Sequence, residues 1–167
     1  TAKNYDTSVP NHWYVNIATG TTTNDGLSVS TPNKNIRDIT GWTGVGLLTS
    51  GDTINVSAGT YTETVVIDTG GIALIGADST TTIIDPPGDS TIGGLYGIYS
   101  INRNYLTIKN LKITQCNNGI NINNVDSSTI QNITVNYCGT TNNYAIYLTN
   151  SDNNLLTNNV VNFNGEG

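Results

Sequence analysis

The sequence predicts an all-β protein with the fold of a parallel β-helix, a solenoid in which each coil stacks on the previous one. The main observation is a block that occurs three times, as LTIKNLKI (Leu106–Ile113), STIQNITV (Ser128–Val135) and NLLTNNVV (Asn154–Val161). The copies begin 22 and then 26 residues apart. A repeat this short cannot bury its own apolar side chains, so neighbouring copies must stack to make a core.

Identical asparagines at the same offsets are the second observation. They form two columns, Asn110, Asn132 and Asn158 in one and Asn102, Asn124 and Asn150 in the other. Apolar residues alternate on both sides of Asn110, which predicts two strands joined by a bend, because Asn tolerates left-handed backbone angles. Stacked amides would then hydrogen-bond as ladders. A leucine-rich repeat would need helical segments, and a β-sandwich would not need equal spacing of identical residues.

Residues 1–50 are predicted to form an arm, a first strand and a cap. Thr1–Asn11 lacks periodicity and is the expected arm, whereas Trp13–Ile17 alternates apolar and polar residues as a strand does. Thr31 and Pro32 have the pattern of an N-cap and the first residue of a short helix. The apolar residues of this helix would be Ile36, Ile39, Trp42, Leu47 and Leu48. Such a helix would cover the unpaired backbone of the first coil.

Residues 51–167 are predicted to form the coils of one continuous domain. Short β-branched runs lie between Gly and Asp turns at Thr53–Val56, Thr64–Ile67, Ile72–Ile75 and Thr82–Asp85. From Gly97 onward the repeat becomes regular. A chain of 167 residues is long enough for one domain with a continuous core.

The charge balance excludes two classes of partner. Six Lys and Arg residues stand against twelve Asp and Glu, giving a formal net charge of −6, and the basic residues do not cluster, which argues against nucleic-acid binding. No apolar run is long enough to predict a membrane span. The sequence starts at Thr1 and contains no Met, which fits an extracellular or cell-surface protein whose signal peptide has been removed.

Two cysteines follow the repeat. Cys116 and Cys138 are 22 residues apart, so they are expected to stack on adjacent coils at a spacing of about 4.8 Å. They would form either a disulfide or a pair of buried thiols that pack as small apolar groups. Metal binding is not expected at this pair, because His12 is the only histidine.

The segment Gly51–Asp68, followed by GIALIG (Gly71–Gly76), resembles the entry into the first coils of the right-handed parallel β-helix repeat family. Trp13–Gly20 and Asn24–Ile36 are similar to the N-terminal region of that group, the pectate-lyase-like superfamily. The resemblance implies a single-stranded, right-handed solenoid. It does not imply one activity, because this scaffold carries lyases, hydrolases, esterases, epimerases and proteins without catalysis.

The lyases of this superfamily use calcium and a basic Arg or Lys, and the resemblance points to weak candidates for both. The candidate bases are Arg103, Lys109 and Lys112, and the candidate calcium ligands are Asn104, Asp126 and Asp152, which share a column. In the alternative interpretation the three ligands are turn residues that satisfy local backbone donors. No cofactor is expected to be required.

Tyrosines give the chain a candidate surface for sugars. The candidates in the regular part are Tyr99, Tyr105, Tyr137, Tyr144 and Tyr147. Tyrosine rings that face outward can stack on sugar rings, whereas half-buried tyrosines would merely pack between coils. The sequon Asn55-Val56-Ser57 would accept a glycan only if it is exposed.

The last coil is expected to be open. No amphipathic segment follows Leu155, Val160, Val161 and Phe163 to cover them, and open coils are templates for another chain. The main hypothesis is therefore an exported, non-catalytic structural or cell-surface protein that self-associates end to end or through its arm, with a filament as one form. The alternative is a carbohydrate-active module, either a glycan binder or a calcium-dependent polysaccharide lyase.

Overall fold

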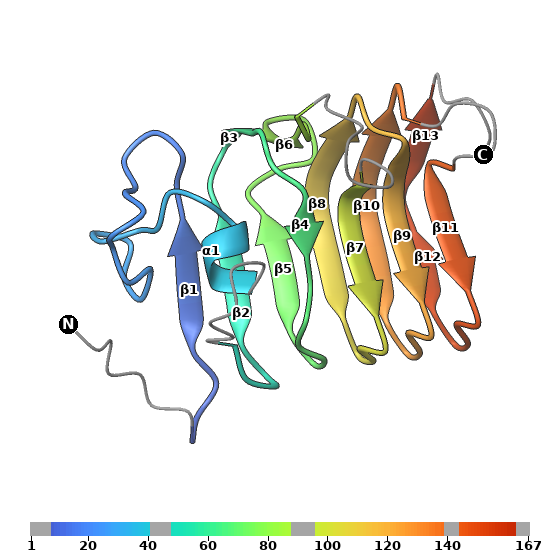
Figure 1. The fold of residues 1–167 in the computed structure, drawn as a ribbon, viewed down its shortest axis with the longest axis horizontal. Helices are drawn as coiled ribbons and strands as arrows, with labels where there is room; N and C mark the ends of the chain where they lie inside the picture. The colour runs from blue at the N-terminus through green and yellow to red at the C-terminus, as the bar shows by residue number, and fades with distance from the viewer. Residues whose placement is uncertain (1–7, 41–47, 88–95, 139–143, 163–167) are drawn as a thin grey trace.

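A computed structural model describes residues 8–40, 48–87, 96–138 and 144–162, and its fold is the expected parallel β-helix (Figure 1). One sheet contains β1 (His12–Val15), β2 (Thr53–Val56), β3 (Gly59–Tyr61), β5 (Ala73–Gly76), β6 (Thr82–Ile84), β8 (Thr107–Thr114), β10 (Thr129–Asn136), β12 (Leu155–Thr157) and β13 (Val160–Asn162). The other contains β4 (Val65–Val66), β7 (Tyr96–Ile101), β9 (Asn118–Asn123) and β11 (Ile146–Thr149). Every pairing between these strands is parallel.

The repeated blocks lie in register, which confirms the stacking predicted from their spacing. Ile108 of β8 pairs with Ile130 of β10, and Ile130 pairs with Leu156 of β12. The alternating residues inside each coil make a continuous apolar core, in which Ile108 and Ile130 are buried. Among the described residues no helix is long and apolar enough to cross a bilayer.

Each regular coil turns at residues with a positive φ. Among the described residues these are Asn102, Tyr105, Asn110 and Gln115 in one coil, Asn124, Ser127, Asn132 and Tyr137 in the next, and Asn150, Asn153 and Asn158 in the third. Asn occupies both predicted columns, where its side chain tolerates the left-handed backbone. The bend at Asn158 separates β12 from β13, so the third block forms two strands, as expected from its phase break.

The amide ladders form between the first two regular coils. Asn132 Nδ2 donates to Asn110 Oδ1 at 2.8 Å, and Asn124 Nδ2 donates to Asn102 Oδ1 at 2.6 Å. The third coil departs from this pattern, because Asn150 Nδ2 donates to Asn123 Oδ1 at 3.3 Å rather than to its column neighbour. This departure occurs where the repeat lengthens from 22 to 26 residues.

The predicted cap helix is shorter than the sequence suggested. Helix α1 spans Arg37–Thr40 rather than starting at Thr31 and Pro32. The backbone before it is held by β1 instead: Asn33 N donates to Tyr14 O at 2.9 Å, and Asn16 N donates to Asn33 O at 2.9 Å. Ile36, Ile39 and Leu48 are buried as expected, whereas Trp42, Leu47 and residues 1–7 of the arm lie outside the described residues.

Glu63, between β3 and β4, fixes where α1 begins. Its buried carboxylate accepts the backbone N–H groups of Ile36 and Arg37, each at 2.9 Å, and Arg37 Nε lies 4.0 Å from Glu63 Oε2. Burial raises the pKa of Glu63 above its ordinary value, although both N–H groups oppose that change. The start of the helix is thus set by a residue 27 positions along the chain from Ile36.

Candidate functional site

The outer side of the four-stranded sheet carries a row of side chains in register. Tyr99 of β7 pairs with Asn121 of β9, and Asn121 pairs with Tyr147 of β11. The residues that flank Asn121, Ile120 and Ile122, are buried in the core, so the row points outward. We call the surface formed by Tyr96, Tyr99, Asn121, Tyr144 and Tyr147 the tyrosine face.

The tyrosines of this face form two stacked pairs. The ring centroids of Tyr96 and Tyr99 are 4.8 Å apart with an interplanar angle of 26°, and those of Tyr144 and Tyr147 are 5.0 Å apart with an angle of 16°. Residues three apart normally point to opposite sides of a strand. Here two consecutive buried residues, Gly97 and Ile98, break the alternation in β7 and bring both rings to one side.

Glycine is required at the break because the coils approach closely there. A Cβ at Gly97 would clash with the carbonyl oxygen of Gly119 in the next coil. The equivalent positions are Gly97, Gly119 and Ala145, all buried. The sequences around them, YGIY, NGIN and YAIY, show that the two tyrosine pairs occupy the same place in the first and third coils.

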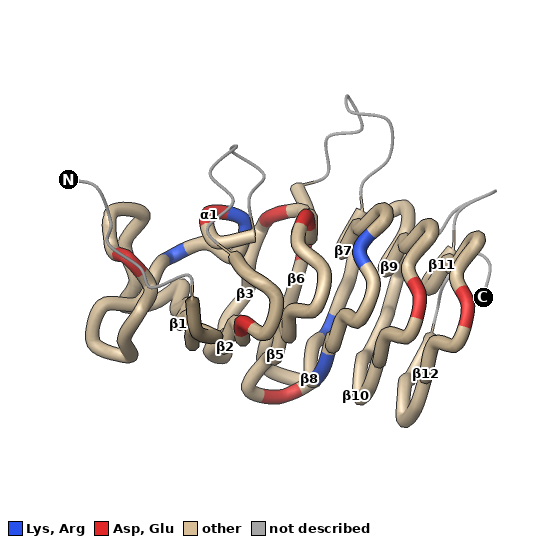
Figure 2. The backbone as a smooth tube through the Cα atoms, turned by 90° about the horizontal axis from the view of Figure 1, so that it is seen from below, with Lys and Arg blue, Asp and Glu red and all other residues tan. Residues whose placement is uncertain are grey.

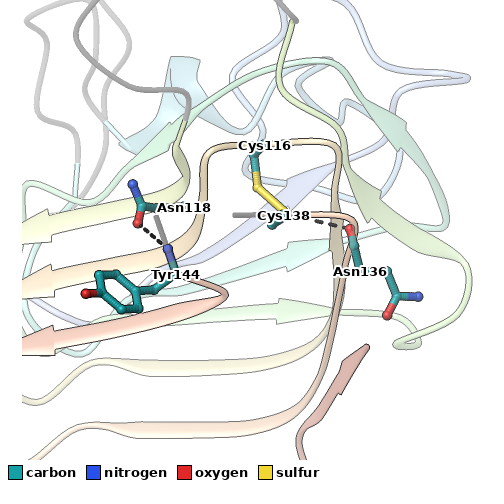
Figure 3. The surroundings of a disulfide bond; sticks show 5 residues. All are labelled: Cys116, Asn118, Asn136, Cys138 and Tyr144. Carbon is teal, nitrogen blue, oxygen red and sulfur yellow. Dashed lines mark hydrogen bonds between the residues drawn. A yellow bond between two sulfur atoms is a disulfide. The ribbon is translucent and has the colours of Figure 1, made fainter. Parts of the chain in front are cut away.

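A disulfide supports the edge of the tyrosine face (Figure 3). Cys116 and Cys138 are bonded, with their Cα atoms 4.6 Å apart, so the disulfide alternative is the one that the structure adopts. Two residues after Cys116, the buried side chain of Asn118 accepts a hydrogen bond from Tyr144 N at 2.9 Å. The start of β9 is therefore tied to one neighbouring coil covalently and to the other through Asn118.

The three candidate calcium ligands form a different column, in the turns that leave the four-stranded sheet. Asp126 N donates to Asn104 Oδ1 at 2.8 Å, and Asp152 N donates to Asp126 Oδ1 at 2.7 Å. Figure 2 shows acidic segments in the turns between β9 and β10 and between β11 and β12. These contacts agree with the turn interpretation, in which each side chain satisfies a backbone donor of the next coil. Calcium binding stays a prediction.

The candidate bases do not gather at one place. Arg103, in the turn after β7, donates through Nε to Asp68 O and through Nη1 to Asn102 O at 3.1 Å. Lys109 and Lys112 belong to β8 in the other sheet, where they pair with Gln131 and Thr134. Arg103 alone adjoins the acidic column, so a lyase site with several bases is not assembled by this fold.

The five predicted tyrosines separate into two groups. Tyr99, Tyr144 and Tyr147 come together on the tyrosine face, whereas Tyr105 and Tyr137 lie at positive-φ corners with 68% and 61% of their surface exposed. Tyr96 and Asn121 were missed as candidates. The recurrence of Tyr-x-x-Tyr in YGIY and YAIY, 48 residues apart, is the signal that would have found Tyr96.

A shallow open groove lies on the outer side of the other sheet. It has a volume of about 190 Å³ and is lined by Tyr14, Asn55, Val56, Ser57, Ile75, Gly76 and Ala77. Asn55 Nδ2 donates to Trp13 O at 3.3 Å, so the amide of the predicted sequon is half-buried and engaged with β1. Glycosylation of Asn55 stays a prediction.

Comparisons with known proteins support the fold and leave the family open. No family model matches the chain, and no curated protein matches it. A solved structure, the GH136 lacto-N-biosidase from Eubacterium ramulus, is similar over 83% of this chain, with a TM-score of 0.50 and 16% sequence identity. The chain spans 27% of the length of that protein. At this identity the likeness shows the fold alone.

Proposed function

We propose that this β-helix binds carbohydrate through the tyrosine face. The observation that carries the proposal is the row Tyr99, Asn121 and Tyr147, in which two aromatic side chains flank an amide in register. Aromatic rings supply rigid apolar surface for the C–H faces of sugars, and a nearby amide supplies a donor and an acceptor for hydroxyl groups. The similarity to part of a lacto-N-biosidase, a carbohydrate-active enzyme, also favours this function over a purely structural one.

The expected affinity is low, because the face is open. Sites that bind small molecules tightly are concave and cover most of the ligand. A few stacking and hydrogen-bond contacts on an open surface correspond to a Kd on the order of 1 mM for a short oligosaccharide. Several copies binding one polysaccharide would raise the apparent affinity without new contacts.

Affinity electrophoresis in gels that contain single polysaccharides, followed by titration calorimetry, tests the proposal. Y99A and Y147A should each weaken binding about tenfold, which corresponds to about 1.4 kcal/mol. Y137A is the matched control, because Tyr137 is exposed but lies outside the tyrosine face. Absence of binding to every polysaccharide, or equal binding by Y99A, Y147A and Y137A, would contradict the proposal.

We also propose that the protein works outside the cell or on its surface. The disulfide between Cys116 and Cys138 supports this location, because disulfides persist in oxidising compartments. Thiol labelling of the native protein, before and after reduction, tests it. Two cysteines that react without reduction would contradict the proposal.

Self-association is a second candidate function, favoured by the last described coil. Leu155 and Val160 are 57% and 47% exposed, and they stand where the preceding coil has Thr129 and Thr134. Two inward-facing residues of the same coil, Leu156 and Val161, are also exposed, in contrast to the buried Ile130. This exposed apolar edge favours a second copy of the chain as its partner.

The first coil does not offer a matching edge. The outer side of β1 is bonded by the cap, since Tyr14 N donates to Gly26 O at 2.7 Å and Asn33 N donates to Tyr14 O. Two copies would therefore join through their last coils as a closed pair rather than a filament. Light scattering at low and high protein concentration should give a dimer that L155S/V160S disrupts. A monomer at every concentration would contradict this candidate.

A further inference from the structure

The tyrosine face has a spacing that narrows the class of ligand. Neighbouring strands of a sheet lie about 4.8 Å apart, so Tyr99 and Tyr147, with β9 between them, are separated by roughly 10 Å along the solenoid axis. The same separation applies to Tyr96 and Tyr144, which flank Asn118 in the same way. The face therefore alternates aromatic, amide and aromatic along the axis, with a period of two strands.

A β-1,4-linked glycan has the same alternation. In its extended ribbon each sugar is rotated by about half a turn relative to the next, so every second sugar presents the same side. The advance per sugar is close to the strand spacing of about 4.8 Å. A ribbon laid across β7, β9 and β11 would place two sugars of the same orientation against Tyr99 and Tyr147, with the intervening sugar at Asn121. An α-linked chain curves away from a straight row.

The charge of the region further restricts the ligand. The residues of the tyrosine face are uncharged, and the adjoining turns carry Asp126 and Asp152, within a chain whose formal net charge is −6. Arg103 is engaged by two backbone carbonyl groups. A polyuronate would meet net repulsion here, whereas a neutral glycan would not.

We propose that the ligand of the tyrosine face is a neutral, ribbon-like β-1,4-linked glycan that lies along the solenoid axis across β7, β9 and β11. This inference rests on the proposed function and adds the shape, charge and direction of the ligand. It requires a chain of at least three sugars for contact with both Tyr99 and Tyr147. A disaccharide reaches one tyrosine pair only.

Titration calorimetry with oligosaccharides of two to six sugars tests the inference. The probes are cello-, manno- and N-acetylchito-oligosaccharides, with malto-oligosaccharides as the α-linked control and oligogalacturonates as the acidic control. At least one β-1,4 series should gain about tenfold in affinity between two and four sugars. The Y147A variant should lose this gain while it keeps the affinity for the disaccharide, and Y137A should keep both.

The possible outcomes separate the two proposals. Binding that depends on Tyr99 and Tyr147 but favours the malto-oligosaccharides or the oligogalacturonates overturns the ribbon inference and leaves carbohydrate binding intact. Equal affinity for two and four sugars in every β-1,4 series also overturns it. No binding to any probe overturns both proposals. A melting temperature shared by Y147A, Y137A and the parent chain ensures that loss of binding is not loss of fold.

Discussion

The irregular coils of residues 51–87 and the regular coils of residues 96–162 build their turns in different ways. In the irregular part the positive φ angles fall on glycines, 98° at Gly51 and 72° at Gly71. In the regular part they fall mainly on asparagines, such as Asn110 and Asn132, whose amides bond to one another between coils. Glycine adopts this conformation freely but adds no contact, whereas Asn adopts it and also links the coils.

This difference explains why the candidate site lies in the regular part. Turns fixed at one offset keep equivalent residues in register, so Tyr99, Asn121 and Tyr147 form a straight row. In the irregular part the strands are shorter, as in the two residues of β4, and the cap covers the first coil. One part ends the solenoid and the other repeats a surface.

The largest expected effect tests the anchor of the irregular part. Asp52 is fully buried, and its carboxylate accepts hydrogen bonds from Asn11 N at 2.6 Å, Trp13 Nε1 at 3.0 Å and Thr49 N at 3.0 Å. D52A should lower the free energy of unfolding by about 4 kcal/mol, because three donors lose a charged acceptor. Urea denaturation measures the change. D152A in the regular part is the control, and a similar loss there would contradict the contrast.

Removal of the disulfide should have the next largest effect, because Cys116 and Cys138 close one complete coil of 22 residues. The double variant C116A/C138A should lose about 3 kcal/mol of stability, mainly through a less restricted unfolded chain. Denaturation of the parent protein with and without reductant provides the independent check. Equal stability of the reduced and oxidised protein would show that the amide ladders suffice.

Substitution of the ladder asparagines tests the turns of the regular part. N132A should cost about 2 kcal/mol, because Ala is strained at φ 54° and the bond to Asn110 is lost. N132G should cost about 1 kcal/mol, since only the hydrogen bond is lost. The difference between the two variants in thermal or urea denaturation isolates the backbone effect. A reversed order would mean that flexibility of the unfolded chain dominates.

The smallest expected effect concerns the pH dependence of the cap. Burial raises the pKa of Glu63 in the folded protein, so the folded state holds this proton more tightly than the unfolded state. The contribution of Glu63 titration to stability is therefore complete below its unfolded pKa and decreases as pH rises through the folded pKa. The stability of the parent relative to E63Q should accordingly fall between acidic and neutral pH.

Asp78 provides a control of opposite sign. Hydrogen bonds from Thr80, through its side chain and its backbone, lower the pKa of Asp78. The stability of the parent relative to D78N should therefore rise with pH and be lost on acidification. Denaturation curves across this pH range check both slopes. Slopes of the same sign in the two comparisons would refute the assignment for Glu63.

The fold was predictable because its evidence is periodic. The offset of 22 residues placed Asn110 beside Asn132 and Cys116 beside Cys138 without any knowledge of distant contacts. The start of α1 was not predictable from the local pattern. Thr31 and Pro32 match a helix start, but Asn33 is bonded to Tyr14 and the first turn is capped by Glu63, which the local sequence does not reveal.

The candidate site was predictable in part for the same reason. Tyr99 and Tyr147 lie at equivalent positions of the repeat, and both were candidates. The stacking of Tyr96 on Tyr99 was not expected, because strand alternation would send them to opposite sides. The irregularity at Gly97 that reverses this expectation is a property of the backbone where two coils meet.

The constant offset of the first regular coils also gives the protein a simple evolutionary route to longer ligands. Duplication of a gene segment that encodes 22 residues, such as Asn102–Asn123, would insert one further strand into each sheet without disturbing the cap. The binding row would lengthen by about 4.8 Å, one sugar unit, for each such insertion. Descendants of this chain would thus measure the length of a glycan by counting their own coils.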